Sequence, residues 1–366
     1  MTGPPARDVE LRTYRVSIAA GILDRVGEVA RQRAPAHRFA VITDEQVGPR
    51  YAERVVASFG SETAPRVITV PAGEAQKTRE TWARVTDMLL GEGFGRDSAI
   101  VALGGGVIGD LAGFVAATFM RGIPYVQVPT TLLAMVDASI GGKTGVDTVA
   151  GKNLVGAFHQ PAAVLVDPET LATLPAQHLR AGLAEIIKHG VIADESYFGR
   201  VVEELPRVLN RGGEAWLDTL TALVARSIEI KAQVVTSDER ESGLRKTLNF
   251  GHTLGHAIEL CGNYEILHGE AVAAGMVLES ALAERAGVAE GGTLDRVRDA
   301  VSAAGLPTDR PRAHQPAQLL AATRTDKKAR GGTVEYALPR RVGAMACAER
   351  GWSCPVRDEL VLEVLQ

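Results

Sequence analysis

The sequence predicts two domains, an N-terminal Rossmann-like α/β domain followed by an α-helical domain. The first half of the 366-residue chain alternates short apolar runs with helical stretches. This pattern is typical of a mostly parallel sheet that helices cover on both faces. From about residue 178 the chain shows helical period and almost no strand signal. We therefore expect domains at 1–175 and 176–366, with a cleft between them. Clefts between domains are favoured ligand sites.

The individual elements are predicted from β-rich, apolar and periodic runs taken in chain order. Tyr14 to Ile18 alternates between apolar and polar residues, as an edge strand does. The other predicted strands of the first domain lie at residues 38–43, 99–103, 125–128 and 163–166, with a helix at 111–119. The helices of the second domain are predicted at residues 181–190, 216–235, 245–260 and 270–286.

The composition excludes several classes of protein. Apolar residues make up 46% and charged residues 23%, as in ordinary globular proteins. The net charge of −4 argues against a nucleic-acid or membrane-surface partner, because both require a positive field. No apolar stretch reaches the ~18 residues that span a bilayer, and the polar start does not resemble a signal peptide. Three cysteines without metal-clip spacing (Cys261, Cys347 and Cys354) fit a reducing cytoplasm.

Lysine is scarce, and this makes the remaining lysines informative. Only eight of the 40 basic residues are lysines, so arginine serves wherever any surface cation is sufficient. In such a chain, a lysine indicates a site that needs a compact ammonium group rather than the planar guanidinium group of arginine. Any single one is also compatible with an ordinary surface position. The eight are Lys77, Lys143, Lys152, Lys188, Lys231, Lys246, Lys327 and Lys328.

A glycine-rich loop indicates a nucleotide site in the first domain. Gly104, Gly105 and Gly106 follow a predicted strand and open a predicted helix, so backbone amides and the helix dipole can meet a pyrophosphate. The spacing is not the usual GxGxxG, and a purely structural turn explains the loop equally well. Asp44 ends an earlier strand, where it is suited either to bind ribose hydroxyls or to cap a helix. The polar loop 73–77 is a further candidate to close on the nucleotide.

The segment 245–259 carries the strongest chemical signal. On one continuous helix, Arg245, Asn249, His252 and His256 are spaced by four, three and four residues and lie along one face. The glycines in this segment weaken a free helix by ~1 kcal/mol each, so close packing or ligand approach is expected to retain them.

Further residues complete a candidate metal site. His268 opens the next predicted helix, and Glu185 lies with Lys188 on the helix at 181–190. One glutamate and two histidines form the three-ligand zinc site with an open position that is typical of catalytic centres. Each histidine alone is also compatible with a hydrogen-bonded core position.

Taken together, the motifs resemble the 3-dehydroquinate synthase family of sugar phosphate cyclases. The resemblance runs in collinear order over roughly residues 12–345. It rests on GGGVIGDLAGFVAATFMRG, QVPTTLLAMVDASIGGKTGV, GKNLVGAFHQP, AGLAEIIKHG, RKTLNFGHTLGHAIE, LHGEAVAAGM and the DKK at 326–328. It implies a nucleotide-binding α/β domain, an α-helical metal-binding domain, and NAD with Zn²⁺ or Co²⁺ in the cleft between them. The implied reaction converts 3-deoxy-D-arabino-heptulosonate 7-phosphate to 3-dehydroquinate and phosphate, in the shikimate pathway of aromatic amino acid and chorismate biosynthesis.

Position by position, the resemblance implies roles for residues of this sequence. The implied metal ligands are Glu185, His252 and His268, and Glu241 and His256 match proton acceptors. The residues that match substrate contacts are Lys143, Lys188, Arg245 and Asn249, which we expect to be catalytic, and Arg121, Asp137, Asn153, Lys231 and Lys327 or Lys328.

The resemblance also implies the nucleotide site. Its expected residues are Asp44, Glu74, Lys77, Gly106, Val107, Ile108, Gly109, Asp110, Thr130, Thr131, Lys152, Thr170 and Thr173. Three positions depart from the family pattern: Ala72 replaces a common Asp, Asp147 a common Asn, and His189 a common Tyr. None of these departures removes an implied metal ligand or a cation expected to bind phosphate.

The implied reaction is a lyase reaction with an internal redox cycle. An alcohol is oxidised, phosphate is eliminated, the ketone is reduced again and a ring closes by aldol addition, so NAD is recycled. The phosphorylated keto-acid substrate is a polyanion, which explains local lysines in a chain of net negative charge. We expect a homodimer with no nucleic-acid or membrane partner.

Three alternatives differ in class or substrate. A related cyclase (a 2-deoxy-scyllo-inosose, epi-valiolone or aminodehydroquinate synthase) shares NAD and metal, but GGKTG at 141–145 with Arg245 and Asn249 favours dehydroquinate synthase. A polyol dehydrogenase does not need this many lysines suited to bind phosphate. A binding protein without activity does not need the complete ligand set.

Overall fold

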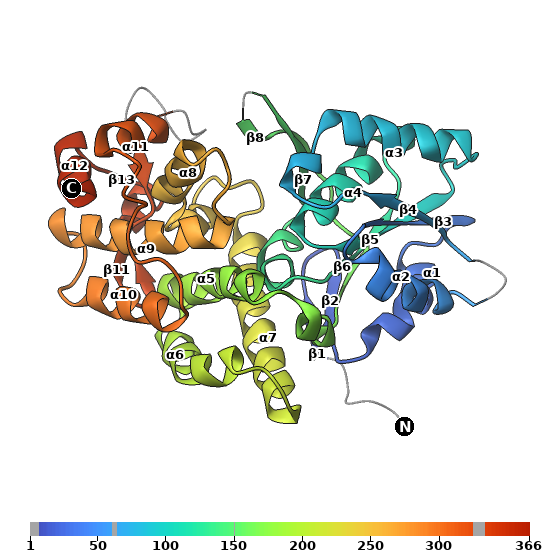
Figure 1. Cartoon of the computed structure of the whole chain (residues 1–366), viewed down its shortest axis with the longest axis horizontal. Helices are drawn as coiled ribbons and strands as arrows, with labels where there is room; N and C mark the ends of the chain where they lie inside the picture. The colour runs from blue at the N-terminus through green and yellow to red at the C-terminus, as the bar shows by residue number, and fades with distance from the viewer. Residues whose placement is uncertain (1–6, 61–63, 150, 325–333) are drawn as a thin grey trace. The chain divides into compact units, whose positions relative to one another are not determined.

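The computed structural model describes residues 7–60, 64–149, 151–324 and 334–366. The chain divides into two compact units, unit 1 at Met1–Leu174 and unit 2 at Pro175–Gln366 (Figure 1). Unit 1 contains an α/β sheet, and unit 2 is mostly helical. The predicted fold class is therefore confirmed.

The described residues of unit 1 form a seven-stranded sheet. It is parallel except for the first strand, which pairs antiparallel with the second. In spatial order the strands are β1 (Arg7–Glu10), β2 (Arg15–Ile18), β9 (Ala163–Val166), β6 (Tyr125–Pro129), β5 (Ser98–Gly104), β3 (Arg38–Asp44) and β4 (Arg66–Val70).

The five predicted strands are present, but one prediction about them was wrong. The run at 14–18 is not an edge strand, because β2 lies between β1 and β9. Its alternation reflects the antiparallel partner β1, whose residues are mostly exposed. The sequence analysis also missed β4, which forms the opposite edge of the sheet.

Helices cover both faces of this sheet (Figure 1). On one face α1 (Val26–Arg33) and α2 (Gly48–Ala57) pack against Phe39 and Val41 of β3. On the other face α3 (Arg79–Gly91) and α4 (Gly106–Thr118) pack against Ala40 and Ile42 of the same strand. Successive side chains of a strand point to opposite faces, so a two-sided sheet requires the continuous apolar run seen in β3.

A hairpin of β7 (Lys143–Thr148) and β8 (Gly151–Phe158) completes the strands of unit 1. The sequence analysis did not predict it. Most of β8 is exposed, including the apolar side chains of Leu154, Val155 and Phe158, which are 44%, 38% and 59% exposed.

Unit 2 is built from helices with short strand pairs at its C-terminal end. The strand pairs are β10 (Glu335–Tyr336) with β13 (Cys354–Pro355), and β11 (Pro339–Arg341) with β12 (Ala344–Met345). The helices are α5 (Ala176–Ala193), α6 (Glu195–Leu209), α7 (Glu214–Ser237), α8 (His252–Cys261), α9 (His268–Arg285), α10 (Thr293–Ala303), α11 (Pro316–Thr323) and α12 (Asp358–Leu365).

The prediction of a single continuous helix at residues 245–260 was wrong. Residues Leu244–Asn249 form a short 3-10 helix, and α8 starts only at His252. Gly251 separates them with a left-handed φ of 78°, and a Cβ there would lie 2.8 Å from the carbonyl oxygen of Val272 on α9. Arg245 and Asn249 therefore do not share a helix face with His252 and His256. Close packing of the glycine, as expected, is present, but it interrupts the helix.

The cysteines also differ from the expectation of a reducing environment. Cys347 and Cys354 form a disulfide that closes a short loop next to β13, and Cys261 is free. Sequence spacing alone did not predict this pair. The chain turns back after Cys347, whose carbonyl oxygen accepts the amides of Arg350 and Trp352. Among the helices of the described residues, none combines the length and apolarity needed to cross a membrane.

Candidate metal centre and nucleotide site

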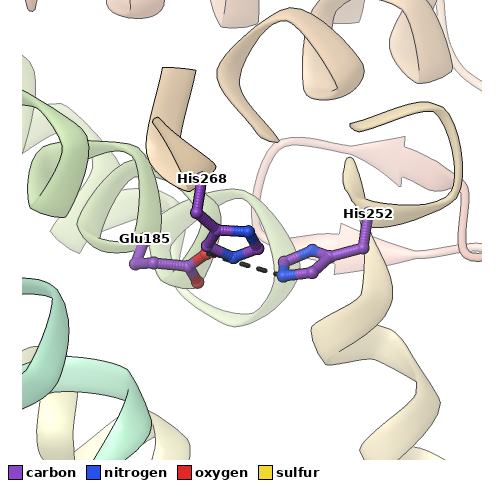
Figure 2. A group of neighbouring side chains, drawn as sticks. All are labelled: Glu185, His252 and His268. Atoms are coloured by element: carbon purple, nitrogen blue, oxygen red, sulfur yellow. Dashed lines mark ion pairs between the residues drawn. The ribbon is translucent and has the colours of Figure 1, made fainter. Parts of the chain in front are cut away.

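Three potential metal ligands converge in unit 2, each from a different helix. Glu185 lies within α5, His252 is the first residue of α8, and His268 is the first residue of α9. Figure 2 shows the carboxylate and the two imidazole rings pointing toward one another. The Nε2 atoms of His252 and His268 lie 3.6 and 3.8 Å from Oε1 of Glu185.

These distances fit an intervening divalent metal. They are too long for hydrogen bonds. Two ligand atoms at ~2.0–2.1 Å from a tetrahedral zinc ion lie about 3.4 Å apart, close to the observed spacing. Oε1 of Glu185 is buried and has no hydrogen-bond partner among the described residues, while Lys188 forms an ion pair with Oε2. The three side chains therefore form a suitable donor set for a metal ion.

Each histidine is oriented by a partner on its other ring nitrogen. Nδ1 of His252 donates to the carbonyl oxygen of Phe250 at 3.1 Å, because a carbonyl can only accept. Nδ1 of His268 lies 3.1 Å from the buried carboxylate of Glu259. Such bonds hold the ring in place and make Nε2 the nitrogen suited to bind a metal. The sequence analysis missed Glu259, although its position on the helix after His252 and His256 was a usable signal.

The backbone also sets the spacing of the ligands. Gly269, next to His268, packs so closely on α5 that a Cβ would lie 2.0 Å from the carbonyl oxygen of Ala181. The start of α9 is thereby held against the helix that carries Glu185. Any side chain at this position would move His268 away from Glu185.

His256 lies beside the ligands but belongs to a different donor set. Its ring centre is 5.3 Å from that of His252 and 5.9 Å from that of His268. With Glu259 and His268 it forms a second group able to hold a metal. Within that group, His268 Nδ1 contacts the Glu259 carboxylate directly at 3.1 Å, which is a hydrogen-bond distance. The Glu185 group, whose facing atoms are spaced as ligands around an ion, is therefore the candidate metal centre, and the ring of His256 lies beside it.

Several cations expected to contact substrate are buried in unit 2. Lys188 on α5, Lys231 on α7 and Arg245 are each almost fully buried. Lys and Arg are rarely buried unless they are paired. Lys188 pairs with Glu185, and Nη1 of Arg245 donates to the carbonyl oxygen of Glu239 at 2.6 Å. Buried cations of this kind suit the recognition of an anionic ligand.

The turn before Arg245 brings two predicted site residues together. Asn249 Nδ2 donates to Glu241 Oε1 at 2.7 Å, and Glu241 has a left-handed φ of 60°. Asp238 holds this turn, because it accepts from the amides of residues 242, 243 and 245. Burial opposes ionisation of Asp238, but these amide bonds outweigh it and lower its pKa to about 2.

His189, one of the departures from the family pattern, has a defined position. It is fully buried on α5, and its Nδ1 lies 2.6 Å from the hydroxyl of Ser227 on α7. The residue therefore packs between two helices of unit 2.

In unit 1 the glycine loop lies at a switch point of the sheet. After β3 the chain continues to β4 on one side, and β5 returns to the other side of β3. The helices that follow β3 and β5 cover opposite faces of the sheet. Ligands bind at the carboxyl ends of strands at such a point. Gly106 begins α4 there, and the amide of Thr130, the residue after β6, donates to the carbonyl oxygen of Gly104.

The glycine loop has a packing role, as the structural interpretation of its sequence expects. A Cβ at Gly104 would lie 2.7 Å from Ile108. Thr131 accepts the amide of Ala134 at 3.2 Å, whereas the buried Thr130 hydroxyl has no hydrogen-bond partner among the described residues. An unpartnered buried hydroxyl beside the loop fits a bound ligand.

Three further predicted nucleotide contacts, Asp44, Thr170 and Thr173, serve local structure. Asp44 Oδ1 accepts the amides of Gln46 and Val47, so it caps the turn that leads into α2. Tyr51 of α2 contacts the hydroxyl of Thr173 at 2.5 Å and the carbonyl oxygen of Thr170 at 3.2 Å. These contacts hold the helix after β3.

A buried lysine organises the remaining nucleotide-site candidates. Lys77 Nζ lies 2.8 Å from Glu74, 3.4 Å from Asp110 and 3.7 Å from Asp147, and Lys152 lies 3.9 Å from Glu74. Burial raises the pKa of Asp110 to about 6, although Lys77 opposes this shift. Burial also raises the pKa of Asp147, against the charge of Lys77. Asp147, a departure from the family pattern, thus joins this cluster.

The remaining substrate candidates of unit 1 are placed separately. Asp137 lies in a π-helical turn (Ala134–Ala138), a feature common at functional sites. Arg121 and Asn153 are exposed and have left-handed φ values, and the exposed Lys143 begins β7. Lys327 and Lys328 lie outside the described residues.

Comparison with solved structures assigns the fold to the sugar phosphate cyclases. A 2-deoxy-scyllo-inosose synthase complexed with carbaglucose-6-phosphate, NAD⁺ and Co²⁺ matches with a TM-score of 0.88 and 27% identity, covering 98% of this chain and 99% of its own. A 2-epi-5-epi-valiolone synthase from Streptomyces hygroscopicus with NAD⁺ and Zn²⁺ bound matches with a TM-score of 0.84 and 30% identity, covering 98% and 97%.

The sequence comparisons specify the family within this class. The models of the 3-dehydroquinate synthase N-terminal and C-terminal regions match residues 67–181 and 182–329. The 3-dehydroquinate synthase of Symbiobacterium thermophilum is 48% identical, covering 90% of this chain and 92% of its own. That of Desulforamulus reducens is 45% identical, covering 92% and 93%. The chain belongs to the 3-dehydroquinate synthase family.

Proposed function

We propose that this protein converts 3-deoxy-D-arabino-heptulosonate 7-phosphate to 3-dehydroquinate and phosphate, as a carbon–oxygen lyase with an internal redox cycle. The observation that carries the proposal is the Glu185, His252 and His268 centre with the buried Lys188 on one of its carboxylate oxygens. Relatives of 44–48% identity over about nine-tenths of the chain or more bear the name of this activity.

We propose NAD and one Zn²⁺ or Co²⁺ ion as cofactors. The metal would be held by Glu185, His252 and His268, and the nucleotide by the glycine loop and the Lys77 cluster of unit 1. When bound, NAD supplies an acceptor and later a donor of hydride, and the metal supplies Lewis acidity toward a substrate oxygen.

The cations of unit 2 would bind the substrate's anionic groups. Arg245 offers a planar fork for carboxylate or phosphate, and Lys188 and Lys231 offer compact charges. Their burial excludes competing water, which strengthens the attraction to a polyanion. Asn249, held by Glu241, is placed to read a substrate hydroxyl.

Proton transfer would fall to His256 and Glu241. Oxidation of the alcohol to a ketone acidifies the neighbouring C–H bond, whose electron pair then expels phosphate as the C–O bond breaks. His256 lies next to the ligand rings and outside the Glu185 donor set, so its imidazole is suited to hold that proton. Return of the hydride and closure of a C–C bond by aldol addition complete the reaction with no net change in NAD.

The decisive assay follows phosphate and NADH together on the seven-carbon keto-acid phosphate. We expect many phosphates released per NAD, with no accumulation of NADH. Stoichiometric NADH would instead indicate a net dehydrogenase. Release of phosphate only from glucose 6-phosphate or sedoheptulose 7-phosphate would favour a related cyclase, the class of the solved structures that match at 27% and 30% identity.

We further propose a homodimer and a cytoplasmic location. The exposed apolar side chains of β8 support association, because such side chains on an edge strand of a two-stranded sheet favour contact with a second chain. The location is supported by the substrates, since NAD and phosphorylated intermediates are cytoplasmic metabolites. Light scattering on the purified protein tests the first proposal and cell fractionation the second. A monomer that persists at micromolar concentration would contradict the dimer.

A further inference from the structure

Glu279 is a fully buried carboxylate that none of the roles above uses. It lies on α9, eleven residues after His268. Its Oε2 accepts the amide of Gly251 at 2.7 Å, and its Oε1 accepts the amide of Leu254 at 3.0 Å. Both amides belong to the start of α8, the helix that begins with the metal-ligand candidate His252.

These contacts replace a cap that α8 does not provide for itself. The first amides of a helix have no partner within it, and Gly251 at the N-cap has no side chain to accept them. A negative charge at a helix N-terminus is also favoured by the helix dipole. A buried carboxylate is costly unless it is hydrogen-bonded, so the two amides and Glu279 satisfy each other. The cap of α8 therefore comes from a different helix.

Backbone packing reinforces this link between α8 and α9. A Cβ at Gly275 of α9 would lie 2.0 Å from the carbonyl oxygen of Gly251, so the two backbones touch. Gly251 precedes His252 directly, and the start of α9 carries His268. One helix thus supplies one metal ligand and fixes the backbone that supports another.

We propose that Glu279 is a positioning residue of the metal site, which fixes the Gly251–His252 backbone so that His252 Nε2 faces Glu185. The inference rests on the proposed metal site. Without the carboxylate, the first turn of α8 loses two backbone hydrogen bonds and His252 is held less firmly. Metal affinity should then fall even though every ligand is still present.

The test uses the full chain with Glu279→Gln. The side-chain oxygen of Gln can accept a hydrogen bond from one of the two backbone amides, but its NH₂ group then faces the other amide and cannot accept from it. Affinity for Zn²⁺ is measured by competition with a chromophoric chelator, and the site is probed by the visible absorption of bound Co²⁺. We expect affinity about tenfold weaker, the size of effect typical of residues that orient metal ligands, together with an altered Co²⁺ spectrum.

Glu284→Gln is the matched control. Glu284 lies on the same helix, and its carboxylate also accepts a helix amide, that of Leu294 at 3.0 Å, but on α10, which carries no ligand candidate. We expect it to lose stability without a change in metal affinity or spectrum. Equal effects of the two variants on affinity would overturn the proposal, as would wild-type affinity in Glu279→Gln.

Two further outcomes are informative. If Glu279→Gln does not fold, Glu279→Asp repeats the test. This variant keeps the negative charge, but its side chain is one methylene shorter, so the carboxylate lies farther from the start of α8. Weaker Zn²⁺ binding by folded Glu279→Asp supports the proposal, and wild-type binding contradicts it. If the wild-type chain itself binds no Zn²⁺ or Co²⁺, the proposed metal site fails first and this inference fails with it.

Discussion

The buried charge clusters of the two units differ in whether protein groups alone complete them. In unit 1 the ammonium of Lys77 lies within 2.8–3.7 Å of three carboxylates. In unit 2 the carboxylate oxygen of Glu185 faces two imidazole nitrogens at 3.6 and 3.8 Å. The first arrangement is an ion-pair network with its cation built in. In the second, Lys188 pairs with one carboxylate oxygen of Glu185, and the other oxygen and the two nitrogens have the spacing of ligands around an ion.

The difference indicates what each cluster is built to do. The pKa of Asp110 is raised to about 6, because the effect of burial outweighs the attraction of Lys77. Unit 1 therefore retains an unfavourable buried charge beside a loop suited to phosphate, which is typical of functional sites. Unit 2 instead orients its histidines through Glu259 and the Phe250 carbonyl. Four predictions test this contrast.

Removing a metal ligand should have the largest effect. His268→Ala is expected to lose bound metal and to lower kcat by about a thousandfold or more, since Lewis-acid catalysis is worth several kcal/mol. The measurement is metal content by elemental analysis alongside turnover. His178→Ala is the control, because it lies on α5 with Glu185 but outside the site. Full metal content in His268→Ala, and likewise in Glu185→Ala and His252→Ala, would refute the assignment.

The charge of Asp110 should appear as a pH dependence of stability. Its pKa is raised in the folded protein to about 6, from 3.8. The folded state therefore binds more protons than the unfolded state between these values. This contribution is fully present below about pH 4 and is lost as the pH rises through about 6, by up to about 3 kcal/mol.

Urea unfolding at a series of pH values measures this dependence, and Asp110→Asn should flatten it. The side chain is one-fifth exposed, so the full size is an upper value. An identical pH dependence in Asp110→Asn and the wild type would show that Asp110 is not the group responsible.

The buried Lys188 tests whether a compact charge is needed beside Glu185. Lys188→Arg should lower kcat/KM about a hundredfold, because a planar fork does not fit the enclosed position. Lys246→Arg is the matched control. Its ammonium reaches Ser353 from a partly exposed position, and we expect a change within about twofold. Lys143, exposed on β7, should tolerate Arg better than Lys188 does. Similar losses for Lys188→Arg and Lys246→Arg would refute the inference from lysine scarcity.

The smallest effect is expected for Glu74. It lies 2.8 Å from Lys77, but its side chain is 40% exposed. Exposed ion pairs contribute little, so Glu74→Gln should change the free energy of unfolding by less than about 1 kcal/mol. The affinity of the Glu74→Gln variant for NAD, measured by fluorescence titration, should weaken several-fold if Glu74 belongs to the nucleotide site. Unchanged NAD affinity would confine Glu74 to a surface ion pair.

Much of the fold follows from local sequence patterns. The apolar runs of β3, β5, β6 and β9 and the periodicity of α5, α7 and α9 reflect side chains that repeat at the spacing of one element. The resemblance likewise pointed to Glu185, His252 and His268, because these residues stand in recognisable motifs. Such patterns are read within a few residues and need no knowledge of distant contacts.

Other features depend on contacts between distant residues and appear only in the folded chain. The helix at 245–260 breaks because Gly251 meets the backbone of α9, and β2 is internal because β1 pairs beside it. Glu259 and Glu279 gain their roles from His268 and from the start of α8, and the cysteines pair across a loop. The sequence by itself determined the buried strands, most of the helices and the chemistry of the ligands, since these are local. Only the tertiary structure decided which buried groups orient those ligands, because burial and hydrogen bonding arise when separate helices pack.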